Sequence, residues 1–184
     1  ERKAPHNLYA DTELVREYVD SRGFLFNQDV NPIYNFGTNQ NNWSLGASRV
    51  TLKYSEKTTV IWKLDADQYS RFIADGYAPN TDAVAHNFIT RDGYEDILQA
   101  PTVVVIQGPL YNDEATTLPS VLTVGVGPVT IFHEGKYIEG TWRRNDISDP
   151  FEFLDTNQNK IDVPPSKQWI HLLPLNGEIT ISDN

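Results

Sequence analysis

The chain contains neither cysteine nor methionine among its 184 residues. The absence of cysteine excludes disulfides, thiolate metal sites and cysteine nucleophiles. It leaves the compartment open, although it fits an exported protein that avoids redox chemistry. Because position 1 is Glu1 and not methionine, we expect the chain to be a piece or a processed product of a longer protein.

Positive charge is also scarce. The formal net charge is −10, and the basic clusters are limited to Arg2-Lys3 and Arg143-Arg144. Such small clusters cannot supply the row of phosphate contacts that nucleic-acid binding needs, so we expect no nucleic-acid partner. No apolar run approaches the roughly 18 residues that a membrane-spanning helix requires.

Short segments of alternating apolar residues are abundant. Val50, Leu52 and Tyr54 alternate with polar residues, which is typical of a half-buried strand. Residues 102–107 form a β-branched run, typical of a central strand buried on both faces. The fold class we predict is α+β and β-rich: a mostly antiparallel sheet of about seven to nine short strands, with one or two short helices.

Two segments are the candidates for these short helices. A cap at Asp11 or Thr12 and a stop at Gly23 predict the first helix. Residues 65–76 predict the second helix, with Tyr69 facing inward.

Several segments, in a fixed order and spacing, resemble one known family. They are residues 5–9 (PHNLY), 69–71 (YSR), 102–106 (TVVVI), 135–142 (GKYIEGTW), 153–155 (FLD) and 168–170 (QWI). On these segments the chain resembles the C-terminal portion of the YerB-like family of bacterial lipoproteins, a family of unknown function. The chain departs from the family pattern within residues 77–100, where His86 is displaced.

The resemblance implies an exported, extracytoplasmic protein of the cell envelope. It implies a lipid anchor, outside this chain, that holds the protein to the outer face of the cytoplasmic membrane. It also implies an upstream N-terminal domain of the same protein as a partner. Residues 1–35 would be the end of that upstream domain, and residues 36–184 would be the β-rich C-terminal domain.

The segment around His6 holds the first candidate site residues. His6 and Asn7 could present an imidazole for acid–base catalysis or for ligand binding, and Tyr9 lies in the same segment. The alternative is that His6 and Asn7 fix the loop through hydrogen bonds to the backbone. The second interpretation is favoured, because a lone histidine has no visible nucleophile or metal partner.

Arg71 and Tyr69 are the second pair of candidate ligand-binding residues. Arg71 could bind a carboxylate or a phosphate in a cleft, or form a structural ion pair with Asp65, Asp67 or Asp75. The ion pair is the favoured interpretation. Because residues two apart on a helix do not share a face, we do not expect Tyr69 and Arg71 to act together directly.

The aromatic residues and one Asp-Asn turn complete the candidates. Trp62, Trp142, Trp169 and Tyr137 could stack against sugars, but a role in the core is favoured. Residues 155–159 match the start of a calcium loop. The positions for its glycine and glutamate hold Lys160 and Ser166, so a plain turn is favoured. We expect neither a metal nor a cofactor.

No nucleophile elbow or zinc-binding histidine pair is present in the sequence. We therefore expect a non-catalytic extracytoplasmic module of a lipoprotein, which binds a protein partner or an envelope polymer. The alternative is an enzyme acting on the cell wall. Its site would lie at the junction with the upstream domain and would use His6, Asn7, Tyr69 and Arg71.

Overall fold

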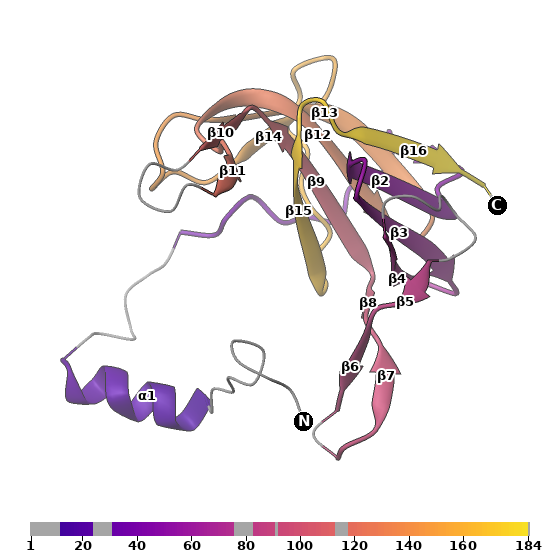
Figure 1. Ribbon diagram of the computed structural model, residues 1–184. Coiled ribbons are helices and arrows are strands. Elements are labelled where there is room, and N and C mark those ends of the chain that lie inside the picture. The colour runs from indigo at the N-terminus through magenta and orange to yellow at the C-terminus, as the bar shows by residue number, and fades with distance from the viewer. Residues whose placement is uncertain (1–11, 24–30, 76–82, 91, 113–117, 184) are drawn as a thin grey trace. The chain divides into compact units, whose positions relative to one another are not determined.

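The structure is a computed structural model that describes residues 12–23, 31–75, 83–90, 92–112 and 118–183 (Figure 1). The chain divides into two compact units, Glu1–Asn31 and Pro32–Asn184. The first unit contains the helix α1, Thr12–Ser21, which ends where Gly23 adopts a φ of 72°. This confirms the first predicted helix. The assignment of residues 1–35 to an upstream domain stays a prediction.

One sheet of the second unit contains the first long strands of the chain. Its strand order is β16-β2-β3-β4-β5, all pairs are antiparallel, and β8 also pairs with β4. Its strands are β2 (Arg49–Ser55), β3 (Thr58–Asp65), β4 (Gln68–Asp75), β5 (Val84–Ala85), β8 (Gln99–Ala100) and β16 (Glu178–Ser182).

The other large sheet has the order β1-β13-β12-β9-β15, and β14 pairs with β13. Its pairs are antiparallel except β15 with β9, which is parallel. Its strands are β1 (Ser44–Leu45), β9 (Thr102–Gly108), β12 (Gly125–His133), β13 (Lys136–Arg144), β14 (Glu152–Leu154) and β15 (Gln168–Pro174).

Two small hairpins complete the described strands. They are formed by β6 (Asn87–Ile89) with β7 (Glu95–Ile97), and by β10 (Leu110–Asn112) with β11 (Pro119–Val121). Figure 1 shows the β6–β7 hairpin projecting from the end of the unit near β8. In the part of the chain that the structure describes, no helix is long and apolar enough to cross a lipid bilayer.

Two hydrophobic cores lie on opposite faces of the β9 sheet. On one face Val103 and Val105 pack with Trp62 and Leu173 in a core shared by both large sheets. On the other face the alternate residues of β9 pack in a second core, which is closed by residues that lie outside the sheet's long strands: Tyr34, Phe151, Phe153, Ile161 and Val163. The prediction that residues 102–107 form a central strand buried on both faces is confirmed.

The predicted fold class is confirmed at its coarse level, but two details are wrong. The protein is β-rich with mostly antiparallel pairing, yet the described residues form sixteen strands, not seven to nine. The additional strands are two or three residues long, which is too short for alternation to reveal in a sequence.

The second predicted helix is also wrong, because Gln68–Asp75 is the strand β4. A two-residue turn with Ala66 at a φ of 55° joins it to β3, and Trp62 pairs with Arg71 across the two strands. Arg71 occupies an inward-facing position of β4. A charged residue at that position interrupts the alternation of apolar and polar residues by which a strand is recognised in a sequence. Tyr69 and Arg71 therefore share a face, contrary to the expectation for a helix.

Candidate functional site

The structure places two of the five predicted site residues. Tyr69 and Arg71 both lie on β4 with buried side chains that face the β9 sheet. The other three, His6, Asn7 and Tyr9, lie outside the described residues.

Tyr69 has a structural role. Its hydroxyl donates a hydrogen bond of 2.8 Å to the backbone oxygen of Ala47 and accepts one of 3.1 Å from the backbone nitrogen of Gly135. Burial raises the pKa of Tyr69 to about 12. The hydroxyl thus stays protonated, and its two hydrogen bonds hold the backbone at Ala47 and Gly135 against the core. Tyr69 is therefore not available to bind a ligand.

Arg71 has different surroundings. Its side chain is 9% exposed, and its guanidinium lies 4.8 Å from the ring centroid of Trp169 and 6.0 Å from that of Trp62. The Nη1 group donates a hydrogen bond to Nδ1 of His86. No hydrogen-bond partner of the buried Nε is found in the described part of the chain.

The favoured ion pair of Arg71 is not formed with Asp65 or Asp67. Both aspartates are exposed at the turn before β4, and no ion pair of Arg71 is found among the described carboxylates. The side chain of Asp75, the third predicted partner, lies outside the described residues.

His171 is locked as a neutral imidazole beside the arginine. The indole of Trp62 donates a hydrogen bond of 2.8 Å to its Nε2, and its Nδ1 lies 2.6 Å from the hydroxyl of Tyr54. Because the indole can only donate, the proton of a neutral His171 must reside on Nδ1 and Tyr54 must accept it. Burial, and secondarily the charge of Arg71, lowers the pKa of His171 to about 3.

The resulting cluster carries a positive charge without a described counterion. We call it the arginine cluster and define it by Arg71 with its aromatic and imidazole neighbours: Tyr54, Trp62, His86, Trp169 and His171. Burial, and secondarily the charge of Arg71, lowers the pKa of His86, so this ring is also uncharged near neutral pH. A buried guanidinium among neutral rings is suited to attract an anion.

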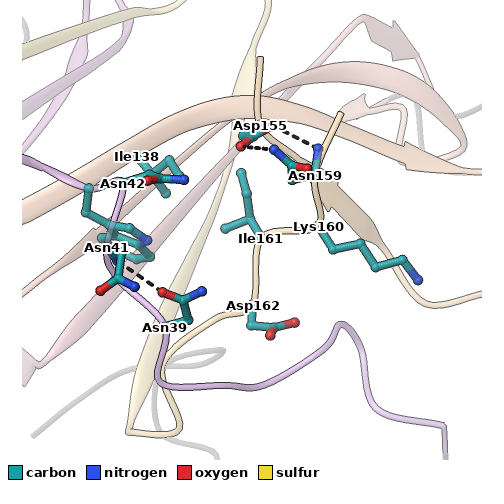
Figure 2. Close-up of a pocket in the computed structure, with 10 residues that line it drawn as sticks. Asn39, Asn41, Asn42, Ile138, Asp155, Asn159, Lys160, Ile161 and Asp162 are labelled. Atoms are coloured by element: carbon teal, nitrogen blue, oxygen red, sulfur yellow. Dashed lines mark hydrogen bonds between the residues drawn. The ribbon is translucent and has the colours of Figure 1, made fainter. Parts of the chain in front are cut away.

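The polar hollow shown in Figure 2 is a separate feature at the second core. It is lined by Asn39, Asn41, Asn42, Trp43, Ile138, Asp155, Asn159, Lys160, Ile161 and Asp162. Asp155 accepts hydrogen bonds of 2.8 Å from the backbone nitrogens of Asn157 and Asn159. The residues the structure describes contain no group of three potential metal ligands, and the favoured interpretation of residues 155–159 as a plain turn agrees with these bonds.

The sequence missed several residues of these two features. The predicted core role of the large aromatics is seen for Trp62 and Trp142, which are fully buried, while Trp169 is half-buried against Arg71. Reading β3 and β4 as a hairpin would have placed Trp62 opposite Arg71. For the asparagines of residues 39–42, the only signal in the sequence is their density.

Comparison with known proteins found a matching family model and a similar solved structure. The model of a family described as protein of unknown function (DUF3048), C-terminal domain, matches residues 50–170. The chain is similar in structure to the YerB protein from Bacillus subtilis, with a TM-score of 0.68 and 16% sequence identity.

The alignment with YerB covers 97% of this chain and 57% of that one, so the chain spans little more than half of YerB. At this identity the likeness shows the fold alone. No curated protein matches the chain. The resemblance to a YerB-like C-terminal portion of unknown function is confirmed.

Proposed function

This chain belongs to the family of the DUF3048 C-terminal domain, and we propose that it is a non-catalytic binding module of a cell-envelope lipoprotein. Its ligand is an envelope polymer or a partner protein, and the arginine cluster holds an anionic group of that ligand, a carboxylate or a phosphate. The resemblance to YerB-like lipoproteins supports the extracytoplasmic location. The proposal includes an upstream N-terminal domain of the same protein as a partner of this chain.

The observation that carries the proposal is the state of Arg71. Burial lowers the pKa of this arginine, yet an arginine remains charged in a protein. Removing a charge from water is costly unless the charge is paired and hydrogen-bonded. Within the described residues the guanidinium of Arg71 has one hydrogen bond, to a neutral histidine, and its Nε has no partner.

The geometry of the guanidinium favours an oxyanion. The Nε–H and one terminal N–H of an arginine form a planar fork that matches two oxygens of a carboxylate or phosphate. The Nη1 group of Arg71 is occupied by His86, whereas Nε is not occupied by any described residue. The guanidinium carbon of Arg71 lies 4.8 Å from the ring centroid of Trp169, a distance at which the ring attracts the positive charge.

The same contacts argue against catalysis at this cluster. Both ring nitrogens of His171 are used by Trp62 and Tyr54, and its pKa of about 3 makes it a poor base near neutral pH. No serine, threonine or cysteine belongs to the arginine cluster. Tyr69, which the enzyme hypothesis required, already has structural partners.

Co-sedimentation with purified bacterial cell walls tests the proposal. We expect the wild-type chain to bind, and Arg71→Gln to bind about 10- to 100-fold more weakly, because a hydrogen bond to a charged group contributes about 1.5–3 kcal/mol. Asp75→Asn is the matched control. If Asp75 were the true partner of Arg71, this substitution would change binding as much as Arg71→Gln does.

The same incubation separates binding from catalysis. We expect no soluble wall fragments in the supernatant, whatever the incubation time. Release of fragments by the wild-type chain would contradict the non-catalytic part of the proposal. Equal binding by wild type and by a folded Arg71→Gln variant would contradict the role of Arg71.

A further inference from the structure

Two neighbouring hollows lie on the side of the second core. The first has a volume of about 220 Å³ and the second about 360 Å³. They share Asn42, Ile138 and Asp155 in their linings. We call the pair the asparagine groove. Its linings run from Asp162 in the first hollow to Thr156 in the second, past Ile138 of β13, so it offers two adjoining places for a ligand.

Two segments far apart in the sequence build the walls of the groove. Residues 35–37 run parallel to Val163, with backbone hydrogen bonds of 2.9 and 3.1 Å between them. A side chain at Gly37 would collide with Asp162, since a Cβ there would lie 2.7 Å from its carboxylate. The close approach holds residues 39–43 opposite the turn at Asp155.

The floor of the groove is apolar and its rim is polar. Ile161 is buried, and Trp43 and Ile138 are half-buried against the second core. Figure 2 shows Asn41 and Asn42 on one side of the hollow and Asn159 across from them. Sugars need this combination, because the C–H face of a ring packs on an aromatic or aliphatic floor while amides bond the hydroxyls.

The side-chain amides on the rim differ in how many of their hydrogen-bond donors and acceptors are already used within the protein. Asn39, Asn41 and Asn42 are exposed. The side-chain oxygen of Asn39 accepts a hydrogen bond of 3.1 Å from the backbone of Asn41, so its NH₂ group keeps its donor capacity. The amide of Asn159 donates to Asp155 at 3.1 Å. The rim thus presents donors and acceptors on side chains that are already partly oriented.

The charges of the groove exclude an anionic ligand. Its linings contain three carboxylates, Glu139, Asp155 and Asp162, against one ammonium, Lys160. That ammonium also lies 3.5 Å from Glu152 outside the groove. Hydrogen bonds from Asn159 and Asn157 lower the pKa of Asp155, which keeps its carboxylate ionised. An anionic polymer would be repelled here, unlike at the arginine cluster.

We propose that the asparagine groove binds an uncharged glycan strand, with one sugar over Trp43 and the next between Asn42 and Thr156. This inference does not rest on the function proposed for Arg71. The two sites take chemically different groups, one neutral and rich in hydroxyls or acetamides, the other anionic.

Titration calorimetry of the 184-residue chain tests the inference. The probes are β-1,4-linked tetramers of N-acetylglucosamine and of glucose, with polygalacturonate as the anionic polymer. We expect one or both tetramers to bind and polygalacturonate not to bind. Trp43→Ala should weaken binding of a tetramer about 3- to 10-fold, the range that an aromatic contact contributes.

A second variant keeps the test valid if Trp43→Ala fails to fold. Asn42→Ala removes an exposed amide shared by both hollows, and Asn176→Ala removes an exposed amide elsewhere. Only the first should weaken binding. Arg71→Gln should bind the tetramers as wild type does, which separates this inference from the proposed function. If neither tetramer binds, or if the Asn42 and Asn176 variants behave alike, the inference is wrong.

Discussion

At the residue scale, the unusual feature of the protein is a pair of buried basic residues, Arg71 and His171. Both side chains are buried on the core face of their strands, yet neither has a carboxylate partner among the described residues. Residues that bind a ligand often reduce the stability of the free protein, because a polar or charged group must stay without hydrogen-bond or ion-pair partners until the ligand binds.

One prediction concerns the stability of an Arg71→Met variant. Methionine keeps an unbranched apolar side chain against Trp169 and removes the buried charge. We expect the free energy of unfolding in urea to stay within about 1 kcal/mol of wild type or to rise. A loss of about 3 kcal/mol or more would show instead that a structural pair of Arg71 had been broken.

A second prediction concerns the pH dependence that His171 causes. Its folded pKa of about 3 lies below the ordinary histidine value of 6.5, so the unfolded chain takes up this proton first as the pH falls. Stability from this group is full above about pH 6.5 and falls as the pH drops from there toward 3. Between pH 7.5 and 5.0 the expected loss is about 2 kcal/mol.

Urea unfolding of wild type and His171→Gln at both pH values measures this contribution. The variant should lose about 2 kcal/mol less than wild type over the interval. The lowered pKa values of His86 and His133 act in the same direction in both proteins and cancel in the comparison. Identical pH dependence in the two proteins would mean that His171 is not buried as a neutral ring.

At the element scale, the strands with clear alternation could be predicted from the sequence, and those with a polar residue on the core face could not. Residues 50–54 and 102–107 lie in strands as expected. Residues 68–75 were misassigned because Arg71 occupies a core position that is normally apolar, while Tyr69, Phe72 and Ile73 happen to follow a helical spacing. The misassignment and the candidate site thus have the same cause.

The pairing of β13 with β14 depends on a residue without a side chain. A Cβ at Gly140 would lie 2.2 Å from the backbone oxygen of Leu154. We expect Gly140→Ala to lower the unfolding free energy by about 1–3 kcal/mol, because the neighbouring strand must shift. Thr141→Ala, on the exposed face of the same strand, should change it by less than about 0.5 kcal/mol. Similar effects of the two substitutions in urea titrations would contradict the observed register.

At the scale of the whole molecule, the sequence indicated the fold class and the family better than the sites. Family resemblance is carried by strands and turns, which are local in the sequence. The arginine cluster joins residues of four strands and His86, and the asparagine groove joins residues 39–44 to residues 137–139 and 155–162. Such sites depend on tertiary packing, which periodicity and motif spacing do not report.

The division into units predicts how the chain tolerates truncation. Both hydrophobic cores consist of residues from Tyr34 onward. A chain starting at Pro32 should therefore unfold cooperatively in a thermal scan monitored by tryptophan fluorescence. A chain starting at Thr38 lacks Tyr34, which is fully buried and pairs with Phe151, and it should be less stable by about 3–5 kcal/mol. Equal midpoints for the two chains would show that Tyr34 does not close the second core.

The side-chain Nε–H signal of Arg71 in a ¹H–¹⁵N correlation spectrum tests the central claim most directly. It is assigned by its absence in Arg71→Lys and followed while inorganic phosphate or acetate is added at constant ionic strength. The account predicts a saturable shift of this signal, because Nε has no partner among the described residues. The Nε–H signals of exposed arginines should move little. An Arg71 signal that does not move with either anion would contradict the claim that this residue forms an anion-binding site.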